Sequence, residues 1–157
     1  MTKNGPVAAN HVGAEAFVVI SALVADYCLA LDANDFDRFR NIWTEDARFT
    51  AEPDLGALPV PLSGRDAIVA AFESRPRRKD SLSRHYTTNL RLTSGEHGTV
   101  HGISAMLAIA NHVSDGSLSL HRTGWYHDVF AVENGEWRII SRLLQYDAAD
   151  PAGEVPA

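Results

Sequence analysis

The chain has 157 residues, of which 45% are hydrophobic, and a net charge of −6 from 20 acidic and 14 basic groups. This length and composition are typical of one globular domain, and the acidic balance argues against nucleic acid or an anionic membrane as the main partner. The single cysteine, Cys28, excludes an internal disulfide and is consistent with a reducing cytoplasm, where we expect the protein to lie.

The first half of the chain predicts three helices and one short strand. Residues 1–13 are expected to form a flexible N-terminal tail, without the basic-then-apolar order of a signal peptide. Apolar residues then recur at helical spacing from Ala14 to Leu31, and no run looked long enough to span a membrane. Asn34 or Asp35 can cap a second helix that runs through Trp43.

A short strand, a loop and a third helix are expected next. The strand is predicted at residues 47–51 and the Pro-containing loop at residues 53–61. The third helix begins at Gly64 and ends before the basic segment at residues 76–80. That segment includes Arg77, Arg78 and Lys79, and is either a solvated loop or a lid that meets an acidic substrate.

The second half predicts an antiparallel meander. Strands are expected at residues 84–93, 98–113, 117–132 and 136–147, with Asn134-Gly135 as the strongest hairpin signal. A flexible C-terminal tail would follow at residues 148–157. Helices at one end of an antiparallel sheet give an α+β fold, in which a curved sheet forms a cone around the first helix and two shorter helices close a pocket.

Three strings resemble the SnoaL-like branch of the nuclear-transport-factor-2-like superfamily. They are residues 27–32 (YCLALD) with 35–39 (DFDRF), residues 84–89 (RHYTTN), and residues 124–128 (GWYHD) with 135–139 (GEWRI). The resemblance covers residues 14–147, the expected domain, and implies the same cone. The branch contains scytalone dehydratase, bile-acid 7α-dehydratase and the small subunits of ring-hydroxylating dioxygenases.

The resemblance also implies a catalytic set. The dehydratases place an aspartate after the first helix and a histidine at the start of the strand that carries the second string, and Asp32 and His85 match these positions. Tyr27 matches a tyrosine of the bile-acid enzyme. Scytalone dehydratase has a second histidine at the position that we match to Ile103. The bile-acid enzyme has an arginine on its last strand at the position that we match to Tyr146. Neither relative's substrate is therefore expected.

The residues themselves leave alternatives at each position. A carboxylate is disfavoured at a helix C-terminus, so Asp32 either pairs with His85 or caps the following helix. Asp128 is expected to hold Arg122, Arg138 or Arg142 in an ion pair. Candidate substrate-binding residues share a predicted place in the pocket; they are Tyr126, Asn89, Phe72, Met106 and Phe130. For each of these residues the alternative is an ordinary structural role in the core or in a turn.

The predicted function is acid–base catalysis next to a carbonyl or hydroxyl of a hydrophobic cyclic or polyketide-like small molecule. His85, oriented by Asp32, would move the proton while Tyr27 and Tyr126 donate to the carbonyl oxygen, as a dehydratase, isomerase or cyclase requires. The scheme needs no cofactor and no metal. A homo-oligomer is expected, with a trimer favoured over a dimer. The alternative is a non-catalytic small subunit or ligand-binding module like the dioxygenase β-subunits.

Overall fold

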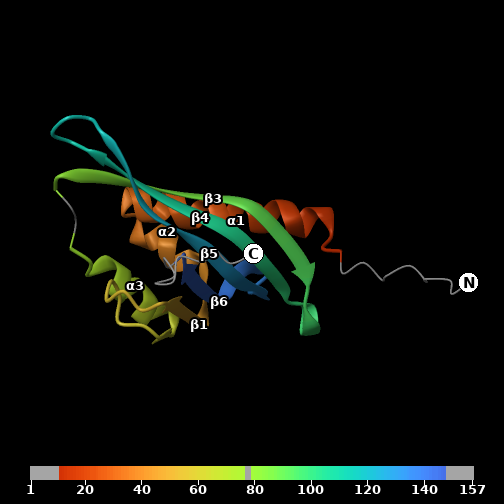
Figure 1. The fold of residues 1–157 in the computed structure, drawn as a ribbon. Coiled ribbons are helices and arrows are strands. Elements are labelled where there is room, and N and C mark those ends of the chain that lie inside the picture. The colour runs from red at the N-terminus through yellow and green to blue at the C-terminus, as the bar shows by residue number, and fades with distance from the viewer. Residues whose placement is uncertain (1–10, 77–78, 148–157) are drawn as a thin grey trace, which may run out of the picture.

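The computed structural model describes residues 11–76 and 79–147 and confirms an α+β cone (Figure 1). Three helices precede the long strands: α1 (Ala14–Ala33), α2 (Phe36–Asn41) and α3 (Arg65–Glu73). The strands are β1 (Trp43–Glu52), β2 (Leu62–Ser63), β3 (Ser81–Ser94), β4 (Val100–His112), β5 (Leu118–Glu133) and β6 (Glu136–Tyr146), with a short 3-10 turn at Glu96–Gly98. The two expected tails lie outside the described residues, apart from residues 11–13.

The strands form one sheet in the order β2-β1-β6-β5-β4-β3. The pairings from β6 to β3 are antiparallel, as the meander predicted, but β1 joins β6 in parallel, so the sheet is mixed. The hairpin at Asn134-Gly135 joins β5 to β6 with both residues at positive φ, as the sequence indicated.

The helix α1 lies against one face of this sheet, which we call the inner face. Along β5 the buried residues alternate with more exposed ones, so Gly124, Tyr126, Asp128 and Phe130 all point inward. Gly124 is required there, because a Cβ would lie 2.3 Å from the carbonyl oxygen of Gln145. The two-residue alternation of a strand therefore decides which side chains of this stretch face α1.

The helix α1 is long and apolar enough, by length and composition alone, to cross a membrane, which corrects the expectation that no run reaches that length. In the fold its inward residues pack in the core; these are Ile20, Val24, Tyr27, Cys28 and Ala30. The helix ends at Asn34, whose left-handed backbone (φ 56) lets its N–H meet the carbonyl of Leu31. Asp35 caps α2 by accepting from the Arg38 N–H.

Trp43 begins β1 rather than ending α2, because its backbone pairs with Ile139 of β6 and its ring is fully buried. Its ring joins an aromatic cluster with Tyr27 and Phe39, at centroid distances of 6.0 Å and 5.7 Å. Phe72 of α3 packs on the same cluster, 5.0 Å from Phe39. This cluster closes the floor of the cone.

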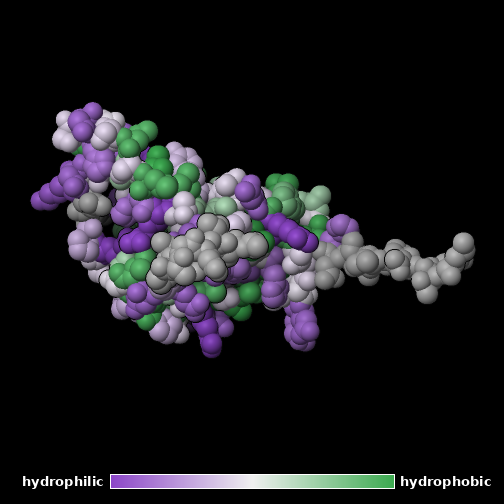
Figure 2. Space-filling view, viewed as in Figure 1, coloured by the Kyte–Doolittle hydropathy of each residue, from purple (hydrophilic) through white to green (hydrophobic). Residues whose placement is uncertain are grey.

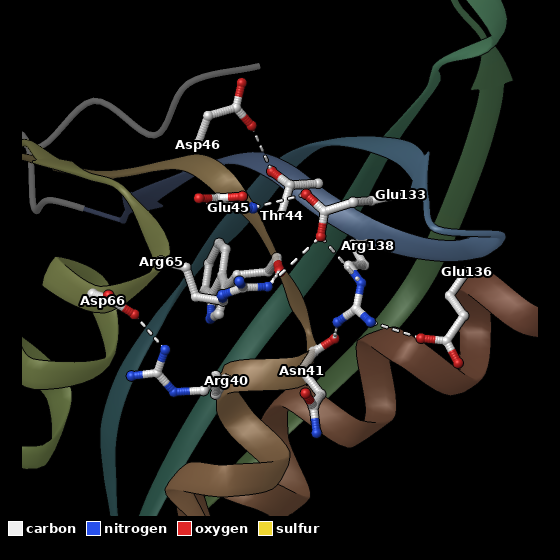
Figure 3. Close-up of polar contacts among 11 residues, drawn as sticks. Arg40, Asn41, Thr44, Glu45, Asp46, Arg65, Asp66, Glu133, Glu136 and Arg138 are labelled. Atoms are coloured by element: carbon white, nitrogen blue, oxygen red, sulfur yellow. Dashed lines mark hydrogen bonds and ion pairs between the residues drawn. The ribbon is translucent and has the colours of Figure 1, made fainter.

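Ion pairs connect β1, α3 and the β5–β6 hairpin around this closed end (Figure 3). Glu133 forms ion pairs with Arg65 at 3.6 Å and with Arg138 at 3.5 Å through one oxygen, and its other oxygen accepts a hydrogen bond from the Glu45 N–H at 2.9 Å. Arg138 also donates to Glu136 at 2.6 Å and to the Asn41 carbonyl. The contacts fix the helices against the sheet and leave the opposite end of the cone open for a site.

Candidate functional site

Asp32 and His85 form a hydrogen-bonded pair at the open end of the cone. Asp32 lies in the last turn of α1 and His85 on the inner face of β3. The His85 Nδ1 lies 2.7 Å from Asp32 Oδ1, and the His85 backbone N–H donates to Asp32 Oδ2 at 3.1 Å. The carboxylate therefore holds both the ring and the backbone of one residue.

This arrangement defines the chemistry of the imidazole. A carboxylate only accepts, so Nδ1 carries the hydrogen and the lone pair of the neutral ring lies on Nε2. No hydrogen-bond partner of Nε2 is found among the described residues. Side-chain exposures of 24% for His85 and 11% for Asp32 leave the pair reachable but mostly shielded from water.

Two buried tyrosines and an arginine lie deeper in the same cone. The rings of Tyr27 and Tyr126 meet edge to face at 5.6 Å, and the Arg142 Cζ lies 4.0 Å from both ring centroids. Asp128 accepts two parallel hydrogen bonds of 2.7 Å from Arg142, confirming one of the three ion pairs considered for it. The guanidinium is thus held by a carboxylate and two aromatic faces, all of them buried.

Burial keeps both phenols protonated. It raises the pKa of Tyr27 from its ordinary value of 10.0 to about 12, although Arg142 acts in the opposite direction. Burial likewise raises the pKa of Tyr126 well above 10.0. Burial opposes the charge of Arg142, but Asp128 outweighs that effect and raises the pKa of the guanidinium. At neutral pH the site therefore contains two hydroxyl donors and one permanent cation.

A cavity of about 100 Å³ lies between His85 and the two tyrosines. Tyr27, Tyr126 and His85 line it, and its remaining wall is mostly apolar; it includes Leu31, Phe49, Leu58, Phe72, Met106 and Leu144. The cavity shares Leu31, Phe72 and His85 with an open groove of about 350 Å³ that also borders Asp32. The geometry suits a small ring held with one edge against His85.

The structure brings most of the candidate residues together, but not all. Phe72 and Met106 line the cavity as expected. Phe130 is fully buried in the core outside it, and Asn89 lies exposed at an irregularity of β3 with a φ of 56°. Cys28 is buried beside the Thr87 hydroxyl, and burial raises the pKa of its thiol, consistent with inert packing.

Sequence reasoning missed the packing of Arg142 beneath the tyrosines. Alternation along the last strand could have found it, because Arg142, Leu144 and Tyr146 share the inner face. Strict alternation from Gly124 would turn His121 outward, but His121 lines the cavity, next to the point where the β4–β5 register shifts between Ala108 and Ile109. Within the described ranges, no group of three or more His, Cys, Asp or Glu side chains could hold a metal ion.

The geometry and the fold agree with a family match. The SnoaL-like domain family matches residues 14–143, so the chain belongs to this family and with it to the nuclear-transport-factor-2-like superfamily. The matched range contains Tyr27, Asp32, His85, Tyr126 and Arg142, and it ends one residue before Leu144 of the cavity wall.

Relatives of known name cover most of the chain. A gamma-hexachlorocyclohexane dehydrochlorinase of Sphingobium indicum is 29% identical over 123 residues, covering 78% of this chain and 75% of the relative. Among solved structures, ActVI-ORFA of Streptomyces coelicolor has a TM-score of 0.75 at 21% identity, covering 85% of this chain and 98% of that one. A putative scytalone dehydratase of Novosphingobium aromaticivorans has a TM-score of 0.68 at 21% identity, covering 90% and 96%. The two structures show the shared fold.

Proposed function

We propose that the protein is a cofactor-independent acid–base enzyme of the lyase type that acts on a hydrophobic cyclic small molecule. The observation that carries this proposal is the Asp32–His85 pair, in which no described residue bonds to Nε2 of His85, at the wall of a cavity that two protonated phenols also line. A dehydrochlorinase and a putative scytalone dehydratase among the relatives support elimination as the reaction type.

The reaction begins with proton transfer. Nε2 accepts a proton from the carbon next to a carbonyl, and the electron pair moves onto the carbonyl oxygen as an enolate. Asp32 stabilises the imidazolium that forms, as an orienting carboxylate does in catalytic triads. Tyr27 and Tyr126 donate hydrogen bonds to the developing oxyanion.

The second step expels the leaving group. As the enolate collapses, the β-carbon loses its hydroxyl, which takes the proton from the imidazolium and departs as water. A carbon–carbon double bond is formed and His85 returns to its neutral state. If the same proton returns to another carbon the result is isomerisation, and if the enolate attacks a second carbonyl the result is cyclisation.

The test uses 3-hydroxy-1-tetralone, which loses water to give 1-naphthol, and γ-hexachlorocyclohexane, whose elimination releases chloride. We expect turnover of at least one, and a kcat lowered about 10²- to 10⁴-fold in His85→Ala, the usual contribution of a general base. His127→Ala is the matched control, because His127 lines a separate groove on the outer face of the sheet. An unchanged rate in folded His85→Ala contradicts the proposal.

We also propose that the protein forms a homo-oligomer through the outer face of the sheet. Large hydrophobic side chains reach the surface there, including Tyr86, Ile103, Leu120 and Trp125, and Figure 2 shows such side chains exposed among hydrophilic ones. Several exposed apolar side chains on one face of a sheet make that face a candidate interface. Mass in solution tests the proposal: a dimer or trimer supports it, whereas a monomer would favour a subunit that needs another partner.

A further inference from the structure

Two arginines border the cavity that contains His85, and the reaction scheme uses neither. Arg75 follows the C-terminus of α3, and Arg122 lies on β5. Both line the cavity, and Arg75 also lines the groove that leads to Asp32. Two cations at one opening contrast with the net charge of −6 of the whole chain.

Strand register places Arg122 directly across from His85. His85 of β3 pairs with Ala108 of β4, and Ala108 pairs with Arg122 of β5. Neighbouring strands lie about 4.8 Å apart, so the two backbones are separated by about 10 Å. The residue between them carries only a methyl group, so the space between imidazole and guanidinium is left to the cavity.

The two guanidinium groups converge on the same cavity, and no carboxylate among the described residues forms an ion pair with either. Arg122 lies over the ring of Tyr146 at 5.1 Å, and Arg75 over the ring of Phe72 at 5.8 Å. Burial raises the pKa of the Tyr146 phenol, while Arg122 and Arg75 both act in the opposite direction, so both charges lie near this group.

Three acidic side chains lie near this opening. Asp32 is hydrogen-bonded to His85. Glu73 borders the open groove that leads to Asp32, and Asp147 borders a neighbouring groove together with Arg122. Among the described residues, no ion pair joins any carboxylate to Arg75 or Arg122.

We infer that the substrate carries a carboxylate, which Arg122 and Arg75 bind at the mouth of the cavity while the ring reaches His85. The inference rests on the proposed function of the same site and adds the substrate class. Guanidinium groups bind carboxylates through paired N–H donors, and their charge is more effective where apolar walls exclude water. Binding the acid at Arg122 fixes which ring carbon faces Nε2, as positioning for proton removal requires.

The test compares two ligands of the same shape, 1-naphthylacetate and 1-naphthylacetamide, by titration calorimetry on the full chain. We expect the carboxylate to bind about tenfold more tightly than the amide, and added salt to weaken only the carboxylate. Arg122→Met should abolish the difference by weakening carboxylate binding about tenfold, and Arg75→Met should reduce it. Arg48→Met is the control, since Arg48 lines the groove on the outer face.

Equal affinities for the two ligands, binding of neither, or a preference that survives in both arginine variants would overturn the inference. Circular dichroism establishes that each variant is folded. If Arg122→Met does not fold, the salt dependence of carboxylate binding by the unaltered chain tests the inference instead. The outcome is separable from the proposed reaction, because His85→Ala should retain the carboxylate preference while losing turnover.

Discussion

Replacing Asp32 with Asn tests whether the carboxylate orients His85. Asn has nearly the same shape but offers one acceptor and one NH₂ donor where Asp offers two acceptors. Asp32 accepts from both Nδ1 and the backbone N–H of His85, at 2.7 Å and 3.1 Å. If the amide oxygen of Asn faces Nδ1, its NH₂ group faces the backbone N–H of His85, and two donors then meet without an acceptor. In the other orientation the NH₂ donates to Nδ1 and moves the ring hydrogen to Nε2, where the base should be free.

The size of the effect follows from the bond that is lost. A hydrogen bond to a charged group contributes about 1.5–3 kcal/mol, and here it stabilises the imidazolium formed during proton transfer. Each 1.36 kcal/mol corresponds to a tenfold change in rate, so kcat should fall about 10- to 150-fold. The free energy of unfolding should change less, because the substitution leaves no cavity.

The assay measures kcat for 3-hydroxy-1-tetralone at neutral pH, with urea unfolding alongside. Asp26→Asn is the matched control, since Asp26 lies on the same helix but pairs with Arg38 at the surface. In Asp32→Asn/His85→Ala the loss should not exceed that of His85→Ala alone, because both residues act as one unit. A kcat within twofold of the unaltered chain in Asp32→Asn would refute the orienting role.

Three further predictions concern the buried groups. Arg142→Met should lower the free energy of unfolding by about 3–5 kcal/mol in urea titrations, because Asp128 is left charged and unpaired; Asp128→Leu added to it should restore part of that loss. Tyr27 has a pKa of 10.0 when unfolded and about 12 when folded. Its contribution to the free energy of unfolding is therefore fully present below pH 10 and declines from pH 10 to 12, because the unfolded state releases its proton first. The free energy of unfolding of Tyr27→Phe should fall by about 2 kcal/mol less than that of the unaltered chain over that interval, and equal slopes would contradict the burial argument. Gly124→Ala should cost about 1–3 kcal/mol by forcing β5 and β6 apart, and an unchanged urea midpoint would show that the strands can adjust.

Local patterns were sufficient for most of the fold. Helical spacing identified α1, and the Asn134-Gly135 turn identified the β5–β6 hairpin, because both depend on neighbours in the chain. The prediction for Trp43 was wrong: an apolar spacing typical of a helix placed it in the second helix, but it begins β1. Its backbone pairs with β6, about 90 residues away in the chain, and no local signal reports such a pairing.

Some contacts of the candidate site could be predicted from the sequence and others could not, for the same reason. The Asp32–His85 contact followed from the family resemblance and from the cost of a carboxylate at a helix C-terminus, and the bond is present. The contact of Arg142 with two tyrosine rings depends on strand register. Arg122 faces His85 only because Ala108 stands between them in the sheet, and His121 turns inward only because the register shifts there. These relations exist only once the sheet has formed.

Hydrogen exchange at the α-carbon of 1-tetralone in D₂O, followed by NMR, tests directly whether His85 removes a proton. It reports proton removal alone, without requiring a leaving group. If Nε2 of His85 is the base, the unaltered chain should accelerate exchange over buffer, His127→Ala should match it, and His85→Ala should lose about 10²-fold or more of the acceleration. Equal acceleration by folded His85→Ala would contradict the account.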